Sequence, residues 1–141
     1  MSLLDRKALL AIAAVVDVAI FARGKLVSAT DLAARHNLPA RHLEPLLQVL
    51  VREGVLKGVR GPRGGYELAR ERRRITVDEI LKAAGTIDEG NDDALPRSTM
   101  LRQVVIPAIG QAEKSFVTAL GRITIEDLAR RAETHKQTPG E

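Results

Sequence analysis

The sequence contains no cysteine, and this absence excludes disulfide bonds, thiolate zinc sites and cysteine nucleophiles. It also lacks any apolar run close to the roughly 18 residues that a membrane-spanning helix requires. Its first residues do not show the order of charge, apolar core and cleavage site that marks a signal peptide. We therefore expect a cytoplasmic protein with no membrane partner. With 141 residues the chain can form one compact domain, or one small domain with an appendage, but not two full-sized domains.

The net charge of +4 is distributed unevenly along the chain. Residues 35–74 contain ten Lys or Arg and four Glu, which gives +6, whereas the other 12 basic and 14 acidic residues leave −2 elsewhere. A basic centre of this kind is typical of a surface that binds a polyanion, because phosphate neutralisation supplies most sequence-independent affinity for DNA. An ordinary solvated face would have the same composition, so charge alone does not decide between the two.

Apolar spacing predicts three helices in the first third of the chain. The first spans about residues 5–22 and stops before Gly24. A capping box at residues 28–31 opens a second helix that runs to about His36. Asn37 tolerates left-handed backbone geometry and Pro39 suits a helix entry, so a tight turn leads into the third helix. The expected core-facing side of the first helix is Leu9, Ile12, Ala13, Val16, Ala19 and Ile20.

The third helix is amphipathic. Four leucines, at positions 43, 46, 47 and 50, form one apolar stripe, and a polar and basic set points about 180° away from it. This outward set is Arg41, Pro45, Gln48 and Arg52. After Gly54, residues 55–59 and 66–69 are predicted to be short strands joined by residues 60–65. The result is a hairpin with a protruding basic tip.

The second half of the chain is expected to be helical. A second capping box at Thr76 opens a helix that ends near Gly85, and an acidic loop covers residues 86–96. A long helix follows from Ser98 and should be kinked by Pro107. Thr124 caps a final short helix, and the polar tail from about residue 135 should be frayed. The long helix carries an apolar stripe that requires a partner helix: Leu101, Val105, Ile109, Ala112, Phe116 and Leu120.

Three helices followed by a basic-tipped hairpin predict a mainly α protein with a small β-hairpin wing, the winged helix-turn-helix architecture. The major groove of DNA admits one helix, whose outward side chains meet base edges. Arg41 can donate two hydrogen bonds to guanine, Gln48 suits adenine, and Glu44 can accept from a cytosine amine. Arg63 at the glycine-rich tip can enter a minor groove. The expected DNA-binding residues are Ser28, Thr30, Ala40, Arg41, His42, Glu44, Gln48, Arg60, Arg63 and Gly64.

The same segments resemble a known family. Residues 29–33, 42–47, 54–56 and 60–70 are similar to the Rrf2 (BadM-type) family of bacterial transcription regulators, and the similarity continues through residues 75–81 and 124–128. The wing sequence Gly61-Pro62-Arg63-Gly64-Gly65-Tyr66 is its most specific element. The resemblance implies a homodimer held by the long C-terminal helix, with the third helix in the major groove and the wing against the minor groove. The expected dimer contacts are Val105, Ile109, Ala112 and Phe116.

One departure from the family pattern is informative. Members that carry an iron-sulfur cluster place three cysteines in the loop before the dimerisation helix, and residues 88–102 here contain none. The resemblance therefore implies a regulator without a cluster, and we expect no cofactor and no metal. The predicted organisation is a DNA-binding domain at 1–85, a flexible acidic loop at 86–97, dimerisation helices at 98–134 and a polar tail at 135–141.

The function expected from these observations is a dimeric, sequence-specific DNA-binding regulator, either a repressor or a dual regulator, whose possible effector is a small molecule or a protein. The alternative is an interaction module whose winged helix docks a partner protein. An enzyme has no support, because the sequence offers no nucleophile-base set and no phosphate-binding loop. Residues 72–74 are interpreted as a phosphate-contacting or solvated arginine run, and the three histidines as surface or capping residues.

Overall fold

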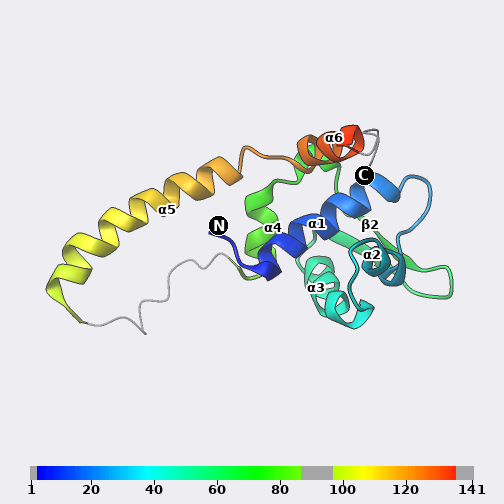
Figure 1. The fold of residues 1–141 in the computed structure, drawn as a ribbon, viewed down its shortest axis with the longest axis horizontal. Coiled ribbons are helices and arrows are strands. Elements are labelled where there is room, and N and C mark those ends of the chain that lie inside the picture. Colours follow the sequence, from blue (N-terminus) through cyan, green and yellow to red (C-terminus); the bar gives the residue numbers. More distant parts are fainter. Residues whose placement is uncertain (1–2, 87–96, 136–141) are drawn as a thin grey trace.

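The computed structural model describes residues 3–86 and 97–135 and forms a helical body from which two segments project (Figure 1). The acidic segment 87–96 and the last six residues, for which the sequence predicts a flexible loop and a frayed tail, lie outside the described residues. The elements are α1 (Arg6–Phe21), α2 (Ala29–Arg35), α3 (Ala40–Arg52), β1 (Leu56–Val59), β2 (Gly65–Leu68), the 3-10 turn η1 (Arg72–Arg74), α4 (Val77–Ala83), the π-helical stretch η3 (Leu101–Val105), α5 (Ile106–Leu120) and α6 (Ile125–His135).

The predicted fold class is confirmed, because helices surround one small antiparallel hairpin. Helix α1 occupies the centre of the body and contacts α2, α3, α4, α6 and β2. The main core combines leucines of α2 and α3 with residues of α4 and α6, so the C-terminal helix belongs to the same body as the first three. Its largest fully buried side chains include Leu32, Leu43, Leu47, Leu50, Ile75, Ile80 and Ile125.

The predicted core face of α1 is confirmed only in part. Ala19 is buried and the half-buried Ile12, Val16 and Ile20 pack against the main core, but Leu9 is 48% exposed and Ala13 is not part of the core. The fully buried side is instead Ala8, Ala11, Ala14, Val15, Val18 and Ala19, of which only Ala19 belonged to the predicted set. Helix α1 is apolar on nearly every side, so periodicity does not identify one face, and its alanines allow neighbouring helices to approach closely.

Two of the three predicted helix caps are confirmed. The Ser28 hydroxyl accepts from the amide of Asp31 at 3.1 Å, and Thr124 and Asp127 cap each other reciprocally, each bond measuring 3.1 Å. Thr76 does not cap α4 with its side chain; its hydroxyl donates to the carboxylate of Asp78.

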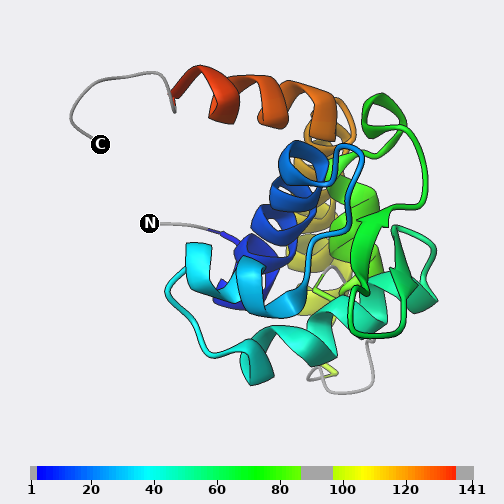
Figure 2. The same ribbon diagram turned by 90° about the vertical axis from the view of Figure 1, so that its right-hand side faces the viewer.

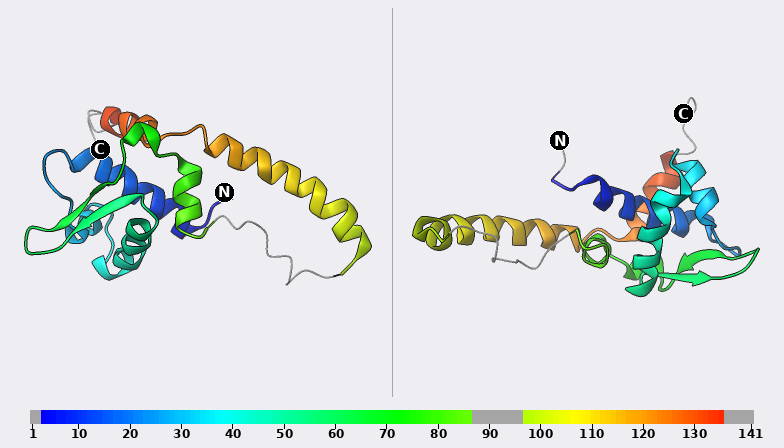
Figure 3. Two further views of the ribbon diagram at one scale, coloured as in Figure 1. Left: turned by 180° about the vertical axis from the view of Figure 1, so that it is seen from behind. Right: turned by 90° about the horizontal axis from the view of Figure 1, so that it is seen from below.

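The hairpin forms the predicted wing. Leu56 pairs with Leu68 and Val59 pairs with Gly65, and the intervening tip points away from the body (Figure 3). A backbone bridge between Val27 and Tyr66 ties the second strand to the segment before α2. Gly64 is required at the tip, since a Cβ there would lie 2.2 Å from the carbonyl oxygen of Val59.

Helix α5 extends from the body in the direction opposite to the wing (Figure 3). Only its C-terminal end is packed: Leu120 is buried, and the half-buried Phe116 lies against a cluster that includes Val77 and Leu81. The π-helical stretch η3 leads directly into Pro107 in the first turn of α5, where the sequence predicts a kink. In the residues that the structure describes, no helix is long and apolar enough to cross a membrane.

Candidate nucleic-acid interface

Helix α3 presents the face that the sequence predicts. Arg41, Glu44, Gln48 and Arg52 are exposed, and the four leucines on the opposite side are buried. Pro45 lies inside the helix on the exposed side, and the helix continues through it to Arg52. Because the buried leucines fix the orientation of α3 on the core, the same face of the helix always points to solvent.

A groove of about 460 Å³ lies beside this face. Its lining residues come from the start of α2, from α3 and from the wing, and Figure 2 shows how the ribbons of these elements are arranged. Four of the predicted DNA-binding residues line the groove: Ser28, Gln48, Arg60 and Gly64. They come from three different elements, so the fold brings together residues that are up to 36 positions apart in sequence. The groove is open to solvent, and its lining combines polar side chains with glycines and with Val51 and Val59.

Sequence reasoning missed Tyr66 as a member of this groove. Its hydroxyl accepts a hydrogen bond of 3.3 Å from the side-chain amide of Gln48. This bond links α3 to the wing, because Tyr66 belongs to β2 and is also bridged to Val27. The position of Tyr66 at the end of the wing motif was a signal, but the motif alone does not show which side chain it touches.

The other predicted DNA-binding residues lie outside this groove. Arg41, His42 and Glu44 are exposed on the first half of α3, and Arg63 is exposed at the wing tip. Thr30 is exposed on the first turn of α2, and Ala40 is half-buried at the start of α3. His42 lines a second groove, formed with α1 on the other side of α3.

Not every arginine of the basic centre is available to a ligand. Arg41, Arg60 and Arg63 form no ion pair within residues 3–86 and 97–135, and so they carry uncompensated charge. Arg35, in contrast, binds Asp17 through two hydrogen bonds, from Nε at 2.9 Å and from Nη2 at 2.6 Å. The basic surface is therefore smaller than the sequence count of +6 indicates.

Asp17 is the one buried charged residue of the described core, with 5% of its surface exposed. Besides Arg35, its carboxylate contacts Nε2 of His36 at 3.1 Å. His36 is also the C-cap residue of α2, which agrees with the prediction of a surface or capping residue. The guanidinium of Arg35 also lies 4.0 Å from the ring centre of Phe21. The hydrogen bond to Asp17 raises the pKa of Arg35, which stays charged at any physiological pH. This cluster fastens α2 to α1.

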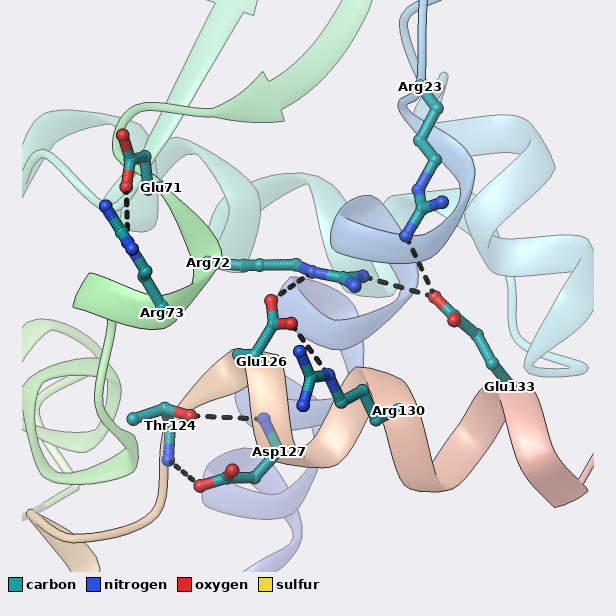
Figure 4. A network of polar contacts seen from close by, with 9 residues as sticks. All are labelled: Arg23, Glu71, Arg72, Arg73, Thr124, Glu126, Asp127, Arg130 and Glu133. Atoms are coloured by element: carbon teal, nitrogen blue, oxygen red, sulfur yellow. Dashed lines mark hydrogen bonds and ion pairs between the residues drawn. The ribbon is translucent and has the colours of Figure 1, made fainter.

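Arg72 is committed to a network with α6 (Figure 4). Its Nε donates to Glu126 at 2.5 Å and its Nη1 donates to Glu133 at 3.1 Å. Arg23 reaches Glu133 at 3.3 Å, and Arg130 reaches Glu126 at 2.8 Å. Although burial opposes it, these bonds raise the pKa of Arg72, and the bond from Arg72 lowers the pKa of Glu126. The interpretation of Arg72 as a solvated or phosphate-contacting residue is therefore wrong.

The two following arginines are different. Arg73 and Arg74 are exposed and lie 2.7 Å and 4.0 Å from Glu71. Exposed pairs of this kind contribute little to stability. Their charges remain near the base of the wing.

Residues 4–131 match the Rrf2 family, described as iron-dependent transcriptional regulators. The chain belongs to the Rrf2 family. It is 30% identical to the HTH-type transcriptional regulator IscR of Xenorhabdus nematophila, over 92% of this chain and 80% of that protein. The resemblance stated from the sequence is confirmed.

Solved structures of Rrf2-type proteins have the same fold. IscR of T. potens superposes with a TM-score of 0.75 at 30% identity, covering 96% of this chain and 92% of that one. CymR of B. subtilis, the global cysteine regulator, gives a TM-score of 0.72 at 25% identity, covering 93% and 98%. This Rrf2 protein is thus a DNA-binding transcription regulator and not an enzyme, and the comparisons do not favour the protein-docking alternative.

The iron dependence in the family description does not fit this chain. Iron-sulfur clusters are held mainly by cysteine thiolates, and this Rrf2 protein has no cysteine. Within the part of the chain that the structure describes, no three His, Asp or Glu side chains are grouped so as to hold a metal ion.

Proposed function

We propose that this Rrf2 protein binds a two-fold operator as a homodimer, with α3 in the major groove and the wing in the adjacent minor groove. The observation that carries the proposal is the groove that joins Ser28, Gln48 and Arg60 beside the exposed face of α3. Its three walls are fixed to one another by the Gln48–Tyr66 hydrogen bond and the Val27–Tyr66 bridge. A preformed surface of this kind binds without first having to order its side chains.

The side chains of the interface have different tasks. Arg41, Glu44 and Gln48 offer the donor and acceptor patterns that distinguish base pairs in the major groove. Arg63 is free to enter the minor groove, where a narrow groove concentrates negative potential. The hydroxyl of Ser28 accepts from the amide of Asp31, which leaves its proton available to a phosphate oxygen. Thr30, two residues further along the chain, is exposed and also carries a hydroxyl that can donate to a phosphate oxygen.

The proposed dimer rests on α5. Val105 is 40% exposed, Ile109 is 55% exposed and Ala112 is exposed, and all three lie on one side of a helix that extends away from the body. An apolar stripe of this length is costly in water, and a second copy is the simplest cover. Phe116 continues the stripe but packs partly on its own chain, so it anchors α5 to the body and borders the interface.

Regulation would follow from occupancy of the operator. A dimer bound at a promoter excludes RNA polymerase from that DNA, and we propose repression in the cytoplasm as its role. Since a cluster does not fit the chain, a small-molecule or protein effector would have to change the operator affinity. Such an effector acts only if it binds the free and DNA-bound forms with different affinity.

Selection from a pool of randomised duplex DNA tests the proposal. The wild-type protein should enrich a motif with two inverted half-sites whose centres are about 10 base pairs apart, one helical turn. The double variant Arg41→Ala/Gln48→Ala should lose this motif, although it keeps its fold because both side chains are exposed. If the wild-type protein enriches no sequence above the starting pool, the proposed function is wrong.

A further inference from the structure

A second groove, of about 380 Å³, lies on the side of α3 away from the wing. It is formed by the first turns of α1, the turn before α3 and the first half of α3. Its floor is apolar, with Leu10, Leu38 and Leu46, and its remaining lining residues are Arg6, Lys7 and His42. The groove therefore combines a packed floor with a basic rim and has no acidic lining residue.

The charges on this rim are uncompensated. Arg6 and Lys7 are exposed and, among the described residues, neither side chain forms an ion pair or a hydrogen bond. The adjacent carboxylate of Asp5 is directed to the start of α1, where it accepts from the amide of Ala8 at 2.8 Å. A phosphate can bind such side chains without first breaking an ion pair within the protein.

The position of the basic rim relative to α3 indicates which ligand the rim would contact. At about 100° per residue, the exposed face of α3 around Arg41 is flanked by Gln48 and Val51 on one side and by His42 and Leu46 on the other. Gln48 and Val51 line the wing groove, and His42 and Leu46 line the second groove. The recognition face thus has a groove along each of its sides.

A helix in the major groove has a sugar-phosphate backbone on each side, because the groove is about 12 Å wide and bounded by both strands. The wing groove would face one backbone. We propose that Arg6 and Lys7 bind phosphates of the other backbone, on the side of α3 opposite to the wing. This inference rests on the proposed function. DNA is the occupant because the rim is continuous with the recognition helix through His42, and because its free charges are all positive.

Such contacts position the protein and carry no base information. Arg6→Ala/Lys7→Ala should therefore weaken binding to the selected operator and to random duplex by the same factor. Each lost phosphate contact lowers the slope of log affinity against log salt by about 0.9, so four contacts in a dimer lower it by about 3.6. Between 50 and 200 mM salt, the wild-type protein should consequently lose about 150-fold more affinity than the variant.

The matched control removes the same charges elsewhere. Lys114 and Arg122 are exposed on and just after α5, and Lys114→Ala/Arg122→Ala should leave the salt slope at the wild-type value. Melting temperatures of all three proteins should agree, since the four side chains are exposed. A wild-type slope in the Arg6/Lys7 variant would overturn the inference, and so would an equal decrease in the control, which would mean a general charge effect. Failure of the wild-type protein to recognise any operator would instead overturn the proposed function, and this inference with it.

Discussion

The substitution Ile109→Glu tests the proposed dimer at an apolar residue of the α5 stripe that is 55% exposed in one chain. Burying an isoleucine side chain contributes about 1.5–3 kcal/mol. Since 55% of Ile109 is exposed in one chain, burial in a dimer would add on the order of 1 kcal/mol per copy. In a dimer the substitution also places two unpaired carboxylates, one from each copy, in the interface between the α5 helices, and each costs several kcal/mol to desolvate. At 1.4 kcal/mol per factor of ten, the dimer dissociation constant should rise by about 1000-fold or more.

Sedimentation at several protein concentrations measures this directly, and operator binding measures its consequence. The variant should be monomeric at micromolar concentration and should bind the full operator about as weakly as a half-site, because dimerisation links two weak contacts. Gln111→Glu is the matched control: it adds the same charge to an exposed position on another side of α5 and should remain dimeric. Helical content by circular dichroism should be unchanged in both. A dimeric Ile109→Glu protein that binds the operator with wild-type affinity would refute the proposal that α5 forms the dimer interface.

Four further outcomes are expected. Gln48→Ala should relax base preference at one or two positions more than it lowers affinity for random DNA, and equal losses on both would count against base reading. Arg63→Ala should cost about 1–3 kcal/mol of operator affinity without changing the melting temperature; an unchanged affinity at matched salt would remove the wing tip from the interface. Gly64→Ala should weaken operator binding by distorting the wing backbone, because its Cβ would lie 2.2 Å from a carbonyl oxygen, and normal binding would show that the tip adapts. The bond from Arg72 lowers the pKa of Glu126, so the stability that this ion pair contributes is present at neutral pH and is lost as the pH falls through that lowered pKa. The variant Glu126→Gln should therefore have a lower melting temperature at pH 7 and a shallower decline of melting temperature on acidification. Parallel profiles of melting temperature against pH would contradict this.

Local features of the fold could be predicted from the sequence. The leucine stripe of α3, the caps at Ser28 and Thr124 and the glycine-rich wing depend on neighbours within a few positions, and the structure confirms them. The fully buried side of α1 could be predicted only in part, because a helix that is apolar all round is oriented by the helices that pack on it.

The polar contacts that hold the residues of the interface in place could not be predicted from the sequence either. Asp17 and Arg35 are 18 positions apart, and Arg72 and Glu126 are 54 apart, so no local pattern pairs them. The prediction of a basic surface from the sequence therefore included both Arg35 and Arg72 as surface charges. For the same reason it could identify Gln48 on the outward face of α3 but not the hydroxyl of Tyr66 that holds it.

The central claim is that one rigid dimer places two α3 helices in successive major grooves. Inserting about five base pairs between the half-sites of the selected operator rotates one half-site by half a helical turn. The affinity measured by titration should then fall to the level of a single half-site, because one α3 faces the wrong side of the duplex. Binding of the lengthened operator with unchanged affinity would contradict the account.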